Sequence, residues 1–233
     1  MFAANNKLMR DLFMLCSLCC MFVSPAFAAK VTQQLYLDEV EKSATMPKSA
    51  FFNRSIRRLS QLPGFLCHFD QLIAFTDGGG KHYSGSVAVL KPKRFRWQYQ
   101  QPYEQLYLGD GEMIWHYEPD LMQAERLDNI EAVDASVMGL LDGSIAATDI
   151  KMFKREYDSD LDIQRFQVRL KDSPEVWLGF SKDGDLVYIE RQDTLGNSNQ
   201  MRLSECSYIA PPKNLFSFTP PAGVDVLDMR QSK

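Results

Sequence analysis

Apolar and polar side chains alternate in several runs between residue 65 and residue 118, and this period of two restricts the possible folds more than any other feature. A period of two places successive side chains on opposite faces of a β-strand. Short turns separate the alternating runs, so we expect neighbouring strands to pair antiparallel as a meander. The large apolar residues form two such runs, one of Phe95, Trp97 and Tyr99 and one of Met113, Trp115 and Tyr117.

The same pattern predicts nine or ten strands in the whole chain. Five lie between residues 65 and 117, and the remainder lie at 166–170, 176–180, 187–189, 201–203 and 216–218. Helical spacing replaces this alternation in three segments. Residues 30–62 are expected as two helices with a break near Met46-Pro47, and residues 129–144 as a helix that stops at Gly143. A further short helix is expected at 147–157. We therefore expect a mainly β (α+β) protein with a strongly curved antiparallel sheet or barrel and helices near its concave side.

The first 28 residues have the features of a secretory signal. Lys7 and Arg10 precede a short apolar run that ends in Pro25 and a small-residue cleavage site before Ala29. The run is too short to span a bilayer, so we expect an exported protein that is not embedded in a membrane. A lipid-anchored precursor is the alternative, although no small residue precedes Cys19 or Cys20 as a lipobox requires.

The charge and the cysteines limit the possible partners. The whole chain carries a net charge of −4, which becomes about −5 after cleavage of the signal. An acidic protein is a poor candidate for binding nucleic acid, whose phosphates require a basic surface. Only Cys67 and Cys206 remain in the mature chain. An oxidising compartment allows them to form a disulfide, but two buried free thiols are equally compatible with the sequence.

Recognisable catalytic machinery is missing from the sequence. His68, His82 and His116 fall on predicted strands without the spacing of a metal site or a catalytic triad, and no G-x-S-x-G, H-E-x-x-H or P-loop pattern occurs. We expect no enzymatic activity, no metal and no cofactor.

The aromatic stripe has two possible explanations. In a sheet packed on helices it is ordinary core. A curved sheet of this size can also enclose a cavity, and scattered methionines adapt to an irregular apolar guest. The expected cavity lining is Phe69, Phe95, Trp97, Tyr99, Met113, Trp115, Tyr117, Met138 and Leu141.

Several motifs occur in a specific order from about Ser49 to the C-terminus. Lys91-Pro92 is followed by Phe95-x-Trp97, Gln101-Pro102-Tyr103, the turn at Asp110-Gly111, Trp115-His116-Tyr117 and the tail FSFTPPAGVDVLD. Residues 49–233 thereby resemble the periplasmic lipoprotein carrier family, LolA. The resemblance implies an incomplete barrel whose open side is covered by helices. It also implies a monomeric periplasmic carrier that takes acylated lipoproteins from an inner-membrane ABC transporter, shields their acyl chains and passes them to an outer-membrane acceptor.

Three departures from the family pattern stand out. Lys91 occupies the position of an arginine that bonds to the lid helices in the closed state, so Lys91 is the expected latch, with three donors from a point charge instead of a planar fork. Ser136 and Val137 stand where members commonly have a proline, and the extension 29–48 is longer than expected. A paralogue that carries another acyl lipid or glycolipid, and an adaptor β-protein whose aromatics are plain core, remain alternatives.

Overall fold

The computed structural model describes residues 49–128, 135–171 and 173–230. The chain groups into two compact units, Met1–Thr45 and Met46–Lys233, and every described residue belongs to the second. The signal expected at 1–28, the extension and helix expected at 29–48, and the first part of the helix expected at 129–144 lie outside the described residues.

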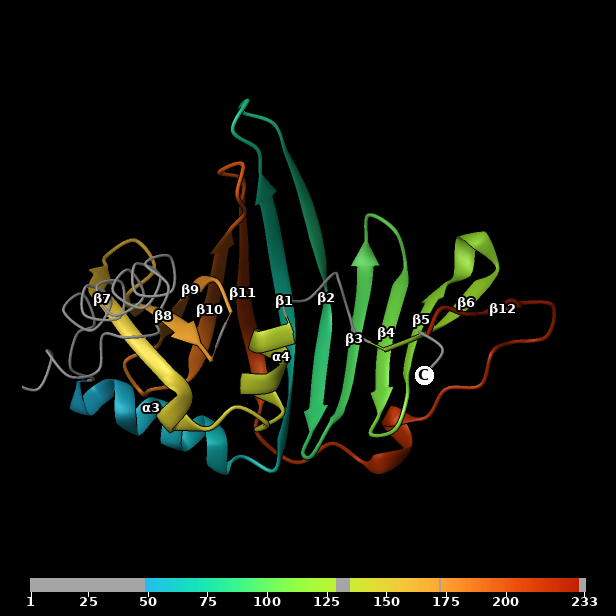
Figure 1. Ribbon diagram of the computed structural model, residues 1–233, viewed down its shortest axis with the longest axis horizontal. Helices are drawn as coiled ribbons and strands as arrows, with labels where there is room; N and C mark the ends of the chain where they lie inside the picture. The colour runs from blue at the N-terminus through green and yellow to red at the C-terminus, as the bar shows by residue number, and fades with distance from the viewer. Residues whose placement is uncertain (1–48, 129–134, 172, 231–233) are drawn as a thin grey trace, which may run out of the picture. The chain divides into compact units, whose positions relative to one another are not determined.

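Within the described residues, twelve strands form one open sheet in the order β12-β6-β5-β4-β3-β2-β1-β11-β10-β9-β8-β7 (Figure 1). The two end strands, β12 and β7, are not paired with each other, so the barrel stays incomplete. The strands are β1 (Gly64–Ala74), β2 (Gly80–Leu90), β3 (Arg94–Gln101), β4 (Gln105–Asp110), β5 (Ile114–Glu118), β6 (Gln123–Leu127), β7 (Ile150–Asp158), β8 (Ile163–Leu170), β9 (Glu175–Phe180), β10 (Leu186–Gln192), β11 (Ser198–Ser207) and β12 (Asp225–Asp228).

The predicted meander is confirmed, because β1 to β5 pair antiparallel in chain order. Pairing of β1 with β11 joins this half of the sheet to the strands that follow residue 149. One pair departs from the antiparallel prediction: β12 runs parallel to β6, with Asp225 opposite Gln123. The long connection that carries the chain from β11 to β12 makes a parallel pair possible.

The helix expected at residues 147–157 is wrong. Only a short 3₁₀ turn, η2 (Ala147–Asp149), precedes strand β7, which pairs with β8 along its length. The segment alternates as well, with Ile150 and Met152 buried and Lys151 exposed between them. Pairing with a distant strand decides between two local patterns of similar strength.

The strand expected at 216–218 is also wrong. The chain forms a 3₁₀ helix there, η3 (Lys213–Phe216), and the last strand lies further on at Asp225–Asp228. Pro211, Pro212, Pro220 and Pro221 surround the segment. Proline donates no hydrogen bond to a sheet ladder, so the segment cannot join the sheet as a regular strand.

Two helices lie against the sheet. α3 (Ala50–Gln61) begins where the Ser49 hydroxyl accepts a 3.1 Å hydrogen bond from the Phe52 amide, and it ends before Pro63. α4 (Ala135–Leu141) ends close to Gly143, whose φ of +80° lies in the left-handed region that a helix stop favours. Figure 1 shows α3 and α4 on the same side of the strands. The predicted arrangement of a curved open sheet carrying helices is therefore confirmed.

Candidate functional site

The face of the sheet that packs on α3 and α4, here called the inner face, is apolar where it meets these helices. The helices contribute Phe52, Ile56, Leu59, Met138 and Leu141 to one continuous cluster of buried side chains. The strands contribute the residues opposite them, which are Phe65, Cys67, Phe69, Val87, Val89, Phe95, Trp97, Tyr99, Phe166, Leu178 and Phe180, among others. This cluster is the largest apolar surface that the described residues bring together.

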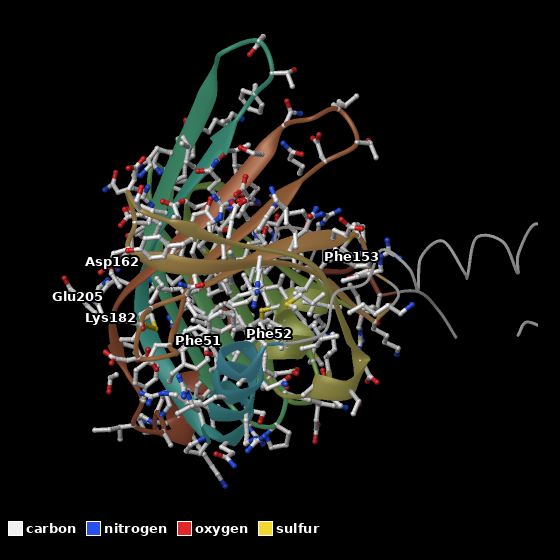
Figure 2. All side chains as sticks on the ribbon, turned by 90° about the vertical axis from the view of Figure 1, so that its left-hand side faces the viewer. Phe51, Phe52, Phe153, Asp162, Lys182 and Glu205 are labelled. Carbon is white, nitrogen blue, oxygen red and sulfur yellow. A yellow bond between two sulfur atoms is a disulfide. The ribbon has the colours of Figure 1, made fainter. Side chains whose placement is uncertain are left out.

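Aromatic contacts fasten α3 to the strands on the β7 side of the sheet. The Phe52 ring lies 4.9 Å from that of Phe166 and 6.0 Å from that of Phe180, between ring centroids. Phe51 stacks on Phe166 at 6.2 Å. In Figure 2 the labelled Phe51 and Phe52 lie on the side of α3 that faces the strands. The helix therefore occupies the apolar surface that a guest would need.

The prediction that the two aromatic runs form one wall is wrong, because they lie on opposite faces. Trp97 is opposite Tyr107 on β4, whereas Trp115 is opposite Leu108, the neighbour of Tyr107. Successive residues of β4 point to opposite faces, so Trp97 points to the inner face and Trp115 away from it. Tyr117, two residues after Trp115, shares its face.

Trp115 and Tyr117 belong to a second cluster on the outer face, together with Leu106, Leu108 and Ala124. The C-terminal segment covers them: the Phe218 ring lies 5.5 Å from that of Trp115 and 5.2 Å from that of Tyr117. The Arg126 guanidinium lies 5.0 Å from the Trp115 ring. These residues are ordinary core, which is the alternative that the sequence left open.

Six of the nine predicted lining residues meet in the inner cluster: Phe69, Phe95, Trp97, Tyr99, Met138 and Leu141. The rings of Trp97 and Tyr99 lie 5.5 Å and 5.2 Å from the Phe69 ring. Gly109 leaves room for the Phe95 ring, since a Cβ there would lie 2.3 Å from Phe95 Cε1. Met113 lies in the turn before β5 and packs on the outer cluster, although it also borders the cavity described below.

The inner face becomes polar on β4, β5 and β6, a feature that the sequence analysis missed. His116 stacks on Tyr107 with ring centroids 4.2 Å apart, and its Nδ1 lies 3.1 Å from Glu125 Oε2. Gln105 donates to Glu118 and Gln123 donates to Glu125, at 3.2 Å and 2.7 Å. The sequence pattern that could have predicted this polar region is His116, Glu118 and Glu125 at alternate strand positions. The sequence alone did not say which face of the sheet these residues occupy.

Two polar side chains are buried in the apolar part of the inner face. Gln71 is 2% exposed and Trp97 is 1% exposed. Gln71 Nε2 donates a 2.8 Å hydrogen bond to Asn199 Oδ1, while Gln71 Oε1 and Trp97 Nε1 have no hydrogen-bond partner among the described residues. Gln71 continues the alternation of Phe65, Cys67 and Phe69 and could have been recognised from it.

Lys91, the predicted latch, reaches the C-terminal end of α3. Its Nζ donates hydrogen bonds to the carbonyl oxygens of Leu59 at 2.6 Å and Ser60 at 3.2 Å. Burial lowers the pKa of the Lys91 ammonium, and the nearby Asp142 carboxylate, just after α4, opposes that effect. Lys91 thus holds the carbonyl end of one helix and lies beside the end of the other, where a cation is electrostatically favoured.

Cys67 and Cys206 form a disulfide, with a distance of 4.1 Å between their Cα atoms. Of the two possibilities that the sequence left open, the structure therefore has the bonded one. The bond joins β1 to β11, which are 139 residues apart in the chain, and Cys67 lies beneath Leu59 and Leu141 in the inner cluster.

The space around the inner face is unevenly filled. Between α3, α4 and the strands, the gap lined by Leu59, Phe65 and Leu141 holds only about 10 Å³, room for about one water molecule. A cavity of about 910 Å³ opens near β3 to β6, with Phe95, Ile114 and Leu127 among its apolar residues and Lys93, Asp142 and Arg230 among its charged ones. A volume of this size is typical of a ligand site.

Within the described ranges the structure holds neither a metal-binding cluster nor a membrane-spanning helix. No group of three or more His, Cys, Asp or Glu side chains in them could hold a metal ion. In the same part of the chain, no helix has the length and apolar character needed to cross a membrane.

Comparison with known proteins identifies the family. The family model described as outer membrane lipoprotein carrier protein LolA matches residues 60–219. An outer-membrane lipoprotein carrier protein from Methylibium petroleiphilum is 32% identical over 163 residues, which cover 68% of this chain and 80% of the relative. A protein of the same name from Nitrosospira multiformis is 36% identical over 154 residues, covering 62% and 72%.

A solved structure of a LolA superfamily protein from Nitrosomonas europaea is similar with a TM-score of 0.45 at 15% identity, covering 73% of this chain and 99% of that one. The family match rests on the sequence, where it spans more than half of the chain and includes most of the strands that form the inner face. The chain belongs to the LolA family of outer membrane lipoprotein carrier proteins.

Proposed function

We propose that this protein carries lipoproteins through the periplasm by shielding their acyl chains on the inner face of the sheet. The observation that carries the proposal is the continuous apolar cluster beneath α3 and α4 in a chain of the lipoprotein carrier family. The lining that we assign to the acyl chains is Phe69, Phe95, Trp97, Tyr99, Met138 and Leu141.

Hydrophobic burial supplies the driving force. Each methylene removed from water is worth about 0.8 kcal/mol, so a few acyl chains exceed the total stability of an ordinary domain. Such chains need an apolar surface, and in the structure α3 and α4 already occupy most of it. Cargo loading therefore exchanges helix contacts for acyl-chain contacts, which keeps the net affinity low enough for release.

Lys91 is suited to govern that exchange. It bonds to two backbone carbonyls at the C-terminal end of α3. Displacing α3 breaks these bonds, and reforming them favours expulsion of the cargo. This is the role that the sequence resemblance implied for the position, here performed by an ammonium.

The proposed compartment is the periplasm, and the family resemblance implies the direction of transport. The signal expected at residues 1–28 leads to export, and the proposed route runs from an inner-membrane ABC transporter that releases lipoproteins to an outer-membrane acceptor. The carrier is expected to act as a monomer, because one inner face holds one set of acyl chains.

The test uses the mature protein and spheroplasts of its own organism. A carrier releases acylated lipoproteins into the supernatant as a one-to-one complex, while a cargo variant whose lipidated cysteine is replaced by serine is not bound. Recovery of only lipid-free protein, with no lipoprotein released, contradicts the proposal.

The alternative cargo, another acyl lipid or a glycolipid, was suggested by lysine at position 91. Since Lys91 reaches the helix carbonyls as an arginine would, that departure no longer favours it. Native mass spectrometry of protein purified from the periplasm distinguishes the two, because a single non-protein lipid would support the alternative.

A further inference from the structure

Polar contacts fasten the C-terminal half of α3 at two separate points. At the first, Lys91 Nζ donates hydrogen bonds to the carbonyl oxygens of Leu59 and Ser60. At the second, Arg58 Nε donates a 2.8 Å hydrogen bond to Asp185 Oδ1, in the turn between β9 and β10. The Asp185 side chain is 17% exposed, so this ion pair is partly shielded from water. Two different loops of the sheet therefore hold the same half of the helix.

The turn between β9 and β10 also packs closely on the middle of α3. Ser55 is completely buried, and a Cβ at Gly184 would lie 3.0 Å from Ser55 Oγ. The Arg58 guanidinium lies 5.9 Å from the ring of Tyr208, which follows β11. The gap that these residues line with Leu59 holds only about 10 Å³. An acyl chain can enter here only after the polar contacts of Lys91 and Arg58 have been broken.

The N-terminal end of α3 is held differently, by apolar contacts. The rings of Phe51 and Phe52 lie 6.2 Å and 4.9 Å from that of Phe166. Within the part of the chain that the structure describes, no hydrogen bond or ion pair joins residues 50–54 to a strand. Apolar contacts are non-directional, so methylene groups can replace them without leaving a polar group unpaired.

A cavity of about 510 Å³ opens at this N-terminal end, a volume in the range of ligand sites. Phe51 and Phe166 line it, and both belong to the inner cluster or pack against it. Three polar residues at its rim satisfy one another: Asp162 accepts a 2.6 Å hydrogen bond from the Tyr157 hydroxyl and lies 2.9 Å from Lys182 Nζ. An acyl chain that enters this cavity therefore meets an apolar wall that continues beneath the helix.

We infer that α3 opens from its N-terminal end and that the first acyl chain of the cargo enters between Phe51 and Phe166. The inference rests on the proposed carrier function and names the entry to the same site. The C-terminal half stays fastened until further chains follow, so the helix pivots about that end. Arg58 and Asp185 are then positioning residues, which form a second latch in addition to Lys91.

The test clamps each end of α3 in turn with a bismaleimide linker between two introduced cysteines. The N-terminal clamp joins Ser49→Cys to Gln164→Cys, two positions that line the 510 Å³ cavity. The C-terminal clamp joins Arg58→Cys to Asp185→Cys, two positions whose native side chains are in contact. The native cysteines are bonded to each other and have no free thiol to react. Each pair before linking is its own control, and mass spectrometry verifies the link.

The measurement is the uptake of a fluorescent fatty-acid analogue with a single chain. Uptake should be lost with the N-terminal clamp and should keep its unlinked rate with the C-terminal clamp. The reverse result overturns the inference, and so does loss of uptake with both clamps, because α3 would then open at its other end or detach completely. Uptake that survives both clamps also overturns it, since the chain would then enter elsewhere, for example through the 910 Å³ cavity.

A substitution tests the second latch without a linker. Arg58→Met should accelerate loading of a whole lipoprotein by up to about fivefold, the range of one exposed ion pair, and leave single-chain uptake unchanged. The exchanged pair Arg58→Asp/Asp185→Arg should restore the wild-type rate. The matched control is Arg169→Met, which breaks a 3.0 Å ion pair with Glu175 between two strands and should change neither rate. Equal acceleration of single-chain uptake by Arg58→Met contradicts the inference.

The carrier proposal itself is tested separately by the unmodified protein. Each result that overturns the entry at the N-terminal end leaves uptake by the unmodified protein, and with it the carrier function, intact. If the unmodified protein takes up no analogue and no lipoprotein, the carrier function fails and the inference fails with it.

Discussion

The ammonium of Lys91 lies 2.6 Å from the carbonyl oxygen of Leu59, at the end of the helix that covers the inner face. This bond joins the loop after β2 to the C-terminal end of α3, whose N-terminal part packs on Phe166 and Phe180 through Phe52. Polar contacts at one end and aromatic contacts along the helix thus act together to keep the inner face covered.

Replacing Lys91 by leucine should weaken this closure. The variant loses two charge-assisted hydrogen bonds at a half-exposed position, roughly 1 kcal/mol or somewhat more. The uncovered state then gains population, so Lys91→Leu should take up cargo, retain it and fail to deliver it to outer-membrane vesicles. Lys91→Arg is the control and should deliver normally. Unchanged delivery by Lys91→Leu would remove the residue from the mechanism.

Removing the disulfide should destabilise the whole sheet. It closes a loop of 139 residues between neighbouring central strands, so the double variant Cys67→Ala/Cys206→Ala should lose about 2–5 kcal/mol of unfolding free energy. Urea denaturation measures this loss. Wild-type protein in reducing agent should match the double variant, and a double variant as stable as the oxidised protein would contradict the structure.

Alkaline pH should lower the stability through buried tyrosines. Burial raises the pKa of Tyr208 to about 12 and also raises the pKa values of Tyr99 and Tyr188 above the ordinary value of 10.0. These groups hold their protons longer in the folded state, so their contribution is complete below pH 10 and is lost as the pH rises toward 12. Denaturant midpoints at pH 9, 10 and 11 should fall, and less steeply in Tyr99→Phe. An identical decline in both proteins would show that Tyr99 does not contribute.

The two tryptophans of the aromatic runs should respond differently to an apolar ligand. A brominated fatty acid quenches tryptophan by contact, so it should quench a variant that keeps only Trp97 and spare one that keeps only Trp115. Trp177 is replaced by phenylalanine in both variants. Equal quenching would mean that both rings line one wall, against the register of β3, β4 and β5.

Much of the architecture could be predicted from local sequence. The period of two identifies the strands from residue 64 to residue 118 and, with short turns, their antiparallel order. Helical spacing up to residue 62 similarly locates α3. The predictions failed where two local patterns compete, as at residues 147–157, and where prolines interrupt an apolar segment, as around Phe216.

The site depended on information that local sequence lacks. Alternation states that Met113, Trp115 and Tyr117 share a face, but a shift of one residue in register exchanges the two faces. Polarity did not identify the inner face here, because on β5 the inner face carries His116, whereas the C-terminal segment covers the apolar outer face.

The residue pattern was enough to predict a curved β-sheet with an apolar face, two cysteines available to pair, and the family of the chain. Contacts in the folded protein were needed to show which aromatics lie under the helices, that β12 runs parallel to β6, that Cys67 bonds to Cys206, and that Lys91 reaches Leu59. Strand and helix formation depend on neighbours in the chain. The register of the strands, the covering of the inner face by helices and the bond from Lys91 to α3 depend on contacts between residues that are tens of positions apart.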